Sequence, residues 1–193
     1  MGRDKAAIPF PGIGDPPLVS WVHRALRPLA SDCLLTAPTD YGLGCSLVPD
    51  HPGFPGPLGG LLAGLLAAPT ALVLAVAADT PFPVPELARR LVGLAWDDPS
   101  AELTVPLRRG LIEPLFAVYR RGAAARMSGV ARRPGESGVP LRRAIELLPR
   151  TEVEESVWRS WDPGATSFIN CNTPDELEAA RLLARDPDKG GLA

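Results

Sequence analysis

Four short segments of this 193-residue chain carry side chains that could hold a phosphorylated ligand. The first segment, MGRDKA, places Lys5 after a glycine, where its ammonium could bind phosphate oxygens as a point charge. The chain contains two lysines, Lys5 and Lys189, against eighteen arginines, so a lysine in this setting is informative. The alternative is a solvated side chain close to a chain end.

The second segment begins at Asp50 and continues through residues 54–60, which read FPGPLGG. A proline-stiffened glycine turn at the start of a helix leaves backbone N–H groups free to face an anion. The segment therefore predicts an anion-binding turn, with an ordinary surface loop as the alternative.

The third segment, DTP, starts at Asp79 and follows the apolar run 71–77. Ligands of parallel α/β sheets gather at the carboxyl ends of the strands. Mg²⁺ is commonly held by one or two carboxylates together with phosphate oxygens. We therefore expect Asp79 to bind Mg²⁺, although a carboxylate here could also serve only as a helix N-cap.

The fourth segment places Asn170 and Asn172 in FINCNTP. Two asparagines at a spacing of two lie on one side of an extended piece, where both could contact a polar ligand. Asn172 could equally serve only the turn that follows. His23, on a predicted helix, and His51, in a loop, are interpreted as structural or solvated.

The elements that must position these segments alternate between strands and helices. This alternation predicts a three-layer α/β domain with a mainly parallel sheet over residues 1–185, followed by a disordered tail, 186–193. Thr173, Pro174 and Glu176 form a capping-box pattern at the start of the last helix. The remaining expected helices cover 17–29, 58–67, 83–94 and two pieces within 122–150, and the expected strands cover 32–36, 45–48, 71–77, 101–106, 111–120 and 151–157, with an extended piece at 167–171.

The stretch from Gly59 to Ala78 has no charged residue and is long enough to span a bilayer. Pro69-Thr70 in its middle reads as a turn, which favours a buried helix followed by a buried strand. We therefore expect no membrane interaction.

Charge and cysteine content limit the other classes of function. Lys+Arg 20 against Asp+Glu 22 gives a formal net charge of -2, without the basic surface of a nucleic-acid-binding protein. Cys33, Cys45 and Cys171 are widely spaced and include no CxxC, a pattern that fits neither a disulfide framework nor a zinc site. This pattern predicts a reducing compartment, the cytoplasm.

Taken in order, MGRDKA, the FPGPLGGL after Asp50, AADTPF, IEPLFAVYRR and FINCNTPDEL resemble the molybdenum cofactor guanylyltransferases, part of the wider MobA-like nucleotidyltransferase group. The resemblance extends from Met1 to about Leu183. It implies a Rossmann-like three-layer α/β/α fold. It also implies a reaction that joins GTP to the terminal phosphate of a molybdopterin-type cofactor and releases pyrophosphate, with Mg²⁺ as cofactor.

The resemblance also implies roles for individual residues. Lys5 would hold the phosphates of GTP, Asp79 would bind Mg²⁺ and the nucleotide phosphates, and Asp50 would contact the nucleotide. Asn170 and Asn172 would lie on the molybdopterin side. Molybdoenzymes or other proteins of the cofactor pathway are the expected protein partners.

The sequence departs from the family at its start. The family begins with a strand and a glycine-rich loop, L-A-G-G-x-S-x-R, that ends in M-G-x-D-K, and Met1 coincides with the methionine of that motif. We therefore expect the first strand and the glycine-rich loop to be missing, through either a late assigned start or a degenerate, inactive form. The alternatives to guanylyl transfer are a related cytidylyltransferase or other nucleotidyltransferase, and a non-catalytic binding module.

Overall fold

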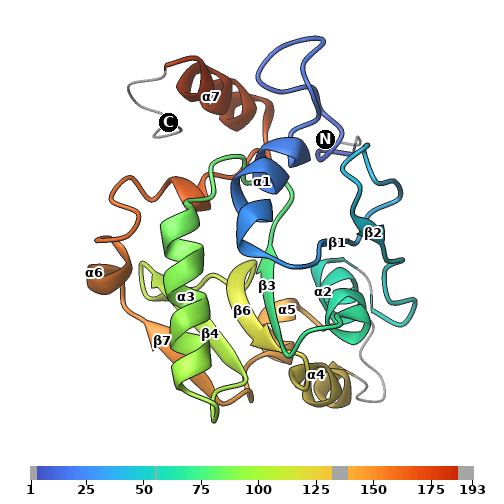
Figure 1. The fold of residues 1–193 in the computed structure, drawn as a ribbon, viewed down its shortest axis with the longest axis vertical. Coiled ribbons are helices and arrows are strands. Elements are labelled where there is room, and N and C mark those ends of the chain that lie inside the picture. Colours follow the sequence, from blue (N-terminus) through green and yellow to red (C-terminus); the bar gives the residue numbers. More distant parts are fainter. Residues whose placement is uncertain (1–3, 55, 132–138, 187–193) are drawn as a thin grey trace.

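A computed structural model of the protein describes residues 4–54, 56–131 and 139–186 (Figure 1). Its centre is a five-stranded mixed sheet with the order β3-β6-β4-β5, in which β7 pairs with β4. β6 runs antiparallel to both β3 and β4, whereas β7 runs parallel to β4. The strands are β3 (Leu72–Val76), β4 (Leu103–Arg108), β5 (Leu111–Ile112), β6 (Phe116–Arg120) and β7 (Arg150–Val153).

The expectation of a mainly parallel sheet is corrected by this pairing. β4 turns directly into β5 through Arg109 and Gly110, which both have positive φ angles, 53° and 73°. Two residues of this kind form the turn that joins antiparallel strands. Because the hairpin reverses the chain, β6 returns antiparallel to β4 and separates it from β3. The α/β class itself is confirmed.

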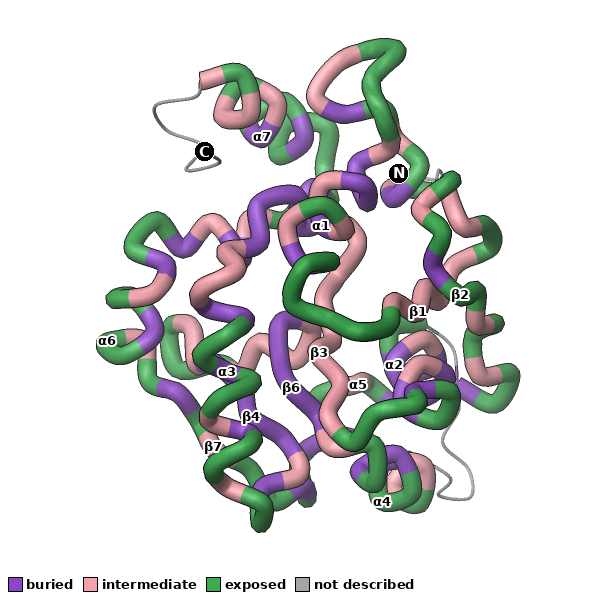
Figure 2. The backbone as a smooth tube through the Cα atoms, in the orientation of Figure 1, coloured by how far each residue is buried: buried purple, intermediate pink, exposed green. Residues whose placement is uncertain are grey.

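Alternate residues of β6 build two separate cores, one on each face of the sheet. Phe116 and Val118 belong to a core formed with α1 and α3, whereas Ala117 and Tyr119 belong to one formed with α2, α4 and α5. The result is the expected three-layer arrangement, and Figure 2 shows the buried colour along β6 at its centre. The helices are α1 (Val19–Leu26), α2 (Pro57–Ala67), α3 (Pro85–Asp97), α4 (Ala123–Ala131), α5 (Leu141–Ala144), α6 (Glu155–Trp158) and α7 (Pro174–Arg185), with 3-10 turns at Arg27–Leu29 and Thr166–Phe168.

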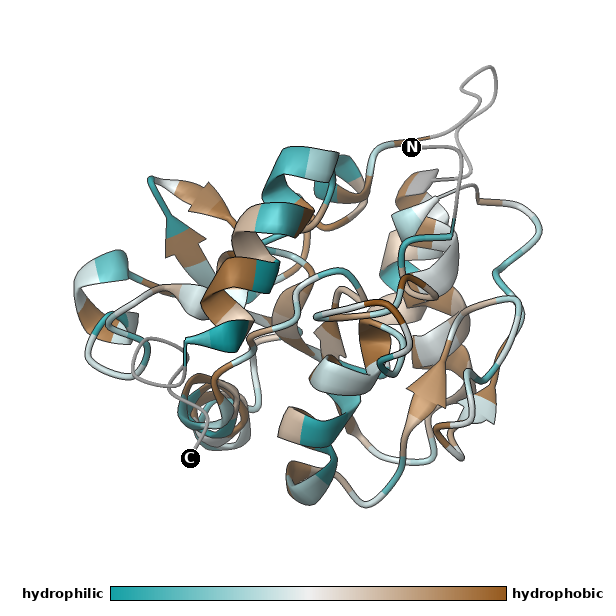
Figure 3. Ribbon diagram, turned by 90° about the horizontal axis from the view of Figure 1, so that it is seen from above, coloured by the Kyte–Doolittle hydropathy of each residue, from teal (hydrophilic) through white to brown (hydrophobic). Residues whose placement is uncertain are grey.

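Residues 59–78 form a helix and a strand, as expected. α2 ends at Ala67 and β3 begins at Leu72, on either side of the predicted turn. In the described part of the chain, no helix has both the length and the apolar character needed to cross a bilayer. Figure 3 shows hydrophilic and hydrophobic residues on the same helical ribbons, as expected for helices such as α3 that pack one face inward, whereas α2 carries no charged residue.

A separate two-stranded parallel sheet lies beside the main one. It pairs β1 (Leu34–Leu35) with β2 (Ser46–Leu47), in a register that places Leu34 opposite Ser46. Among the described residues, β1 has no strand partner besides β2, and β3 has none besides β6.

A disulfide joins Cys33 to Cys45, with 5.0 Å between their Cα atoms, which corrects the expectation that the cysteines form none. The two residues directly precede β1 and β2, and the Ser46 amide donates to the Cys33 carbonyl at 2.9 Å. Parallel pairing therefore sets the two side chains next to each other. Their sequence separation of 12 residues gave no sign of this pairing.

A third core connects the beginning of the described chain to its end. Phe10 and Leu18 pack there with Phe82, Cys171 and Leu177, so the N-terminal loop lies against α7 (Figure 1). This packing brings Lys5 and Asn172 to the same side of the molecule. α7 ends at Arg185, and residues 187–193 of the expected disordered tail lie outside the described residues.

Candidate active site

Three of the predicted site residues converge at the end of β3. The Lys5 Nζ donates to the Asn172 Oδ1 at 2.6 Å and lies 3.6 Å from the Asp79 Oδ2. The Lys5 and Asp79 side chains are 31% and 24% exposed, so both are accessible to a ligand while their positions are restrained. An ammonium, a carboxylate and an amide oxygen thus lie within one hydrogen-bonding cluster.

The backbone after β3 holds Asp79 in place. The Cys171 amide donates to the Asp79 carbonyl at 3.0 Å, which ties the end of the strand to the segment before α7. The buried Thr80 hydroxyl donates to the Ala77 carbonyl at 2.8 Å. These bonds use the Asp79 carbonyl and the Thr80 hydroxyl, so they leave the Asp79 carboxylate available to contact Lys5.

The start of α7 fixes Asn172 in the same way. The Glu176 carboxylate accepts from the Asn172 and Thr173 amides, both at 2.9 Å, and the Glu176 amide donates to the Thr173 hydroxyl at 3.2 Å. The predicted capping box is therefore confirmed. Asn172 belongs to the helix cap through its backbone and to the Lys5 cluster through its side chain.

Asp4 and Tyr41 extend the cluster on the side of the N-terminal segment. The Asp4 carboxylate accepts from the Ala6 amide at 3.1 Å and from the Tyr41 hydroxyl. Burial, followed by the hydrogen bond to Asp4, raises the pKa of Tyr41 to about 12, so the hydroxyl keeps its proton near neutral pH. The sequence analysis missed Tyr41, because a contact across 37 residues leaves no local pattern.

Cys171 lies behind the cluster as a buried free thiol. Burial, and then the negative charges of Asp79 and Glu176, raise the pKa of Cys171 to about 11. The thiolate is the nucleophilic form of cysteine, so this side chain is inert near neutral pH. Its role is to fill the core beneath Asp79.

Asp50 lies on a different loop, next to the start of α2. Gly56, with a φ of 70°, allows the sharp entry into this helix. A Cβ at Gly60 would lie 2.9 Å from the Thr36 Oγ1 and 3.3 Å from the Asp50 Oδ1, so this glycine lets the Asp50 loop approach the helix. Among the described residues, no side-chain hydrogen bond or ion pair joins Asp50 to Lys5 or Asp79.

Asn170 is exposed. Within the part of the chain that the structure describes, no side-chain hydrogen bond or ion pair joins it to Lys5 or Asp79. The segment before it is only partly extended, since Thr166–Phe168 forms a 3-10 turn. The buried Asp162 carboxylate accepts from the Thr166 and Ser167 amides, both at 3.0 Å, which stabilises this turn. A shared role for Asn170 and Asn172 remains a prediction.

Comparisons with known proteins place this chain in a family. Residues 1–151 match the MobA-like NTP transferase domain. The chain is 36% identical over 182 residues to a molybdenum cofactor guanylyltransferase from Pseudomonas putida, covering 92% of this chain and 88% of that protein. The chain belongs to the MobA-like NTP transferase family. A molybdenum cofactor guanylyltransferase from Desulfosudis oleivorans is 33% identical over 171 residues, covering 87% and 82% of the two chains.

Solved structures support the fold of this MobA-like chain. Molybdopterin-guanine dinucleotide biosynthesis protein A from Archaeoglobus fulgidus matches with a TM-score of 0.78 at 21% identity, covering 95% of this chain and 92% of that one. A 2-C-methyl-D-erythritol 4-phosphate cytidylyltransferase from Thermus thermophilus matches with a TM-score of 0.67 at 22% identity, covering 94% of each. The Rossmann-like fold expected from the sequence is therefore confirmed.

The side chains around Lys5 in this MobA-like chain suit a hard divalent cation. Mg²⁺ prefers oxygen ligands, and sites for it often combine one carboxylate with water and substrate phosphates. Asp79 supplies a partly exposed carboxylate, and the Asn172 amide oxygen lies beside the same lysine. The donor set therefore fits a metal that binds together with a phosphorylated substrate.

Proposed function

We propose that this chain is a molybdenum cofactor guanylyltransferase, which transfers GMP from GTP to the terminal phosphate of a molybdopterin-type cofactor and releases pyrophosphate. The observation that carries the proposal is the convergence of Lys5, Asp79 and Asn172 at the end of β3. The names of the relatives from Pseudomonas putida and Desulfosudis oleivorans support the same activity.

The reaction needs positioning and charge stabilisation more than acid–base chemistry. An oxygen of the acceptor phosphate attacks the α-phosphorus of GTP in line. A new P–O bond forms, and the bond from the α-phosphorus to the bridging oxygen breaks, so the electron pair leaves with pyrophosphate. When bound, Mg²⁺ supplies positive charge that offsets the charge developing on the phosphate oxygens.

The residues of this chain contribute binding and orientation. The Lys5 ammonium donates to phosphate oxygens, and Asn172 holds it in place from α7. Asp79 would hold the metal through its carboxylate. In this proposal Asp50 contacts the nucleotide from the start of α2, and Asn170 lies on the acceptor side.

The test is pyrophosphate release from GTP in the presence of molybdopterin, with Mg²⁺ added. We expect Lys5→Met and Asp79→Asn to lower kcat/KM by about 100-fold or more, as found when a preorganised charge-stabilising group is removed. Asp97→Asn, an exposed carboxylate at the end of α3, is the matched control and should retain full activity. Unchanged turnover in both site variants would contradict the proposal.

The alternatives give different results in the same assay. A cytidylyltransferase would use CTP in place of GTP, and a non-catalytic binding module would release no pyrophosphate with either nucleotide. The thermal unfolding temperature should rise with Mg²⁺ and GTP, and less with CTP. Molybdoenzymes as partners and a cytoplasmic location remain predictions.

A further inference from the structure

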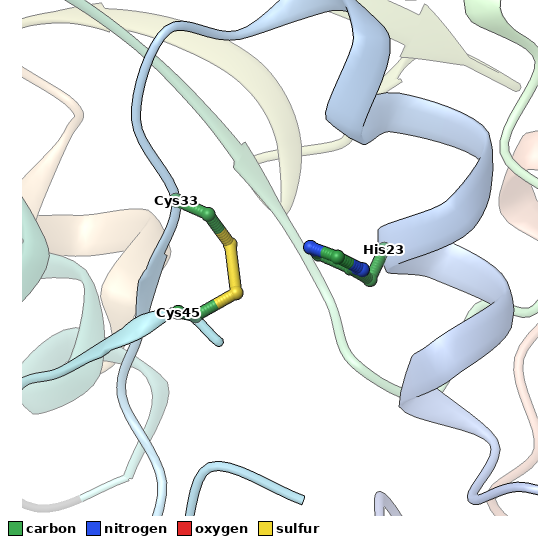
Figure 4. A group of neighbouring side chains, drawn as sticks. All are labelled: His23, Cys33 and Cys45. Atoms are coloured by element: carbon green, nitrogen blue, oxygen red, sulfur yellow. A yellow bond between two sulfur atoms is a disulfide. The ribbon is translucent and has the colours of Figure 1, made fainter. Parts of the chain in front are cut away.

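His23, Cys33 and Cys45 form a cluster on the opposite edge of α1 from the α3 core, and the proposed transfer reaction does not use it. Figure 4 shows the His23 ring, on α1, directed toward the Cys33–Cys45 disulfide. One ligand atom from each of the three residues lies within 4.8 Å of the other two. Cys45 is buried, whereas His23 and Cys33 are partly exposed, so the cluster is restrained but accessible.

Backbone pairing, as well as the disulfide, brings the two cysteines together. The register of β1 and β2 places Cys33 and Cys45 side by side, and the Ser46 amide donates to the Cys33 carbonyl. Reduction of the disulfide would therefore leave two thiols next to each other, facing an imidazole. Among the described residues, no side-chain hydrogen bond or ion pair involves the His23 ring.

Two thiolates and an imidazole are the ligands that zinc prefers, and a fourth position can be filled by water. Tetrahedral zinc has Zn–S and Zn–N distances of about 2.3 and 2.0–2.1 Å, which places its ligand atoms about 3.5–4 Å apart. In the oxidised chain the two sulfur atoms are bonded to each other, and the three ligand atoms lie within 4.8 Å of one another. After reduction, side-chain rotations that move the sulfur atoms apart would bring the three atoms to this spacing without a change of fold. Of the three residues, Cys33 also borders a cavity of about 420 Å³.

We propose that the reduced chain binds Zn²⁺ through His23, Cys33 and Cys45, and that formation of the Cys33–Cys45 disulfide excludes the metal. This site is separate from the magnesium site proposed at Asp79 and does not depend on the transfer activity. The site binds a soft divalent cation, because its donors are sulfur and nitrogen rather than oxygen.

Conversion between the disulfide and the zinc-bound form takes place in two steps, reduction and then metal binding. A dithiol reductant passes two electrons and two protons to the Cys33–Cys45 bond, which yields two protein thiols and leaves the reductant as a cyclic disulfide. Zinc then replaces the two thiol protons, which are released to solvent, and takes the neutral imidazole as its third ligand. A small-molecule disulfide reverses the process by accepting two electrons, and the metal leaves.

The test uses Co²⁺ as a spectroscopic substitute for Zn²⁺. The whole chain is reduced with a dithiol without oxygen, separated from the reductant and titrated with Co²⁺. We expect sulfur-to-metal charge-transfer absorption that saturates at one ion per chain and disappears when Zn²⁺ is added. The oxidised chain should show none of this absorption. A reduced chain that also shows none overturns the proposal.

Histidine variants separate the site from simple binding to thiols. His23→Gln leaves both cysteines in place and should weaken Co²⁺ binding roughly tenfold or more, as expected when a nitrogen ligand is lost. His51→Gln, at the other histidine of the chain, is the matched control and should bind as the unaltered protein does. His23→Cys should restore tight binding with a third thiolate. Equal affinity in the His23→Gln variant and the unaltered chain overturns the three-residue site.

Discussion

The ammonium of Lys5 lies 2.6 Å from the amide oxygen of Asn172, although 167 residues separate the two in the sequence. The capping box of α7 fixes Asn172, and the third core packs the N-terminal loop against the same helix. The position of the proposed phosphate-binding lysine therefore depends on the last helix of the domain. The expectation from the sequence placed Asn172 on the molybdopterin side, whereas we propose from this contact that Asn172 acts on the nucleotide through Lys5, as a positioning residue.

Replacing Asn172 should weaken GTP binding while leaving the protein folded. In Asn172→Ala the Lys5 side chain loses its neutral partner, so we expect KM for GTP to rise several-fold with a smaller change in kcat. The free energy of unfolding should change by about 1 kcal/mol or less, since one exposed hydrogen bond is lost. Steady-state kinetics and urea unfolding measure the two effects. An unchanged KM for GTP would argue against the positioning role.

Asn170 gives a second comparison within the same segment. Asn170→Ala should leave KM for GTP unchanged, because Asn170 lies outside the Lys5 cluster. A rise in KM for the molybdopterin acceptor alone would support its place on the acceptor side. A rise in KM for GTP would contradict the assignment.

Gly60 and Gly64 of α2 allow a matched test of the close approach at Asp50. A methyl group at Gly60 would meet the Thr36 hydroxyl and the Asp50 carboxylate, whereas at Gly64 its nearest neighbour is 3.9 Å away. We expect Gly60→Ala to displace the Asp50 carboxylate and weaken GTP binding. Gly64→Ala should leave binding intact and stabilise the helix by about 0.5–1 kcal/mol. Calorimetric titration with GTP and urea unfolding test both, and equal GTP affinities would contradict a role for the Asp50 loop.

Local features of this fold were predictable from sequence, whereas its long-range pairings were not. Thr173 and Glu176 lie three residues apart, so the capping box could be recognised directly. The strand before Asp79 was recognised as an apolar run of the right length. The direction of β6 depended on a tight hairpin at Arg109–Gly110, and its effect on the sheet appears only when all strands are placed together.

The candidate site was likewise only partly predictable from the sequence. The resemblance to a family indicated Lys5 and Asp79, and the structure brings them together. Tyr41 and the Cys33–Cys45 pair were missed, because each depends on how separate loops meet. The 3-10 turn before Ile169 was also missed, since a buried carboxylate at Asp162 stabilises it from outside the segment.

The contact between Tyr41 and Asp4 predicts a pH dependence of stability at high pH. The folded-state pKa of Tyr41, about 12, lies above the ordinary tyrosine pKa of 10.0, so the folded state holds its proton more tightly than the unfolded state. This contribution to stability is fully present below about pH 10 and is lost as pH rises toward 12.

Tyr41→Phe isolates this contribution, because phenylalanine does not titrate and other high-pH groups are common to both proteins. The difference in unfolding free energy between the two proteins should be constant from pH 7 to about pH 9. It should shift in favour of Tyr41→Phe between about pH 10 and 12. Urea unfolding at each pH measures this difference, and one that does not vary with pH would contradict the raised pKa.

The Cys33–Cys45 disulfide closes the loop that carries Tyr41, so reduction should affect both stability and the proposed site. By the loop-entropy argument, a loop of this length contributes about 3 kcal/mol to the free energy of unfolding. We expect a dithiol, with a chelator present to remove zinc, to lower the free energy of unfolding by about 2–3 kcal/mol. Reduction also removes the covalent restraint on the loop that carries the Tyr41 hydroxyl bound to Asp4, next to Lys5, so GTP binding should weaken as well. The Cys33→Ser, Cys45→Ser double variant should show the lower stability without reductant and no further response to it, whereas Cys171→Ser should respond as the unaltered chain does. A dithiol effect that persists in the double variant would show that the reductant acts elsewhere.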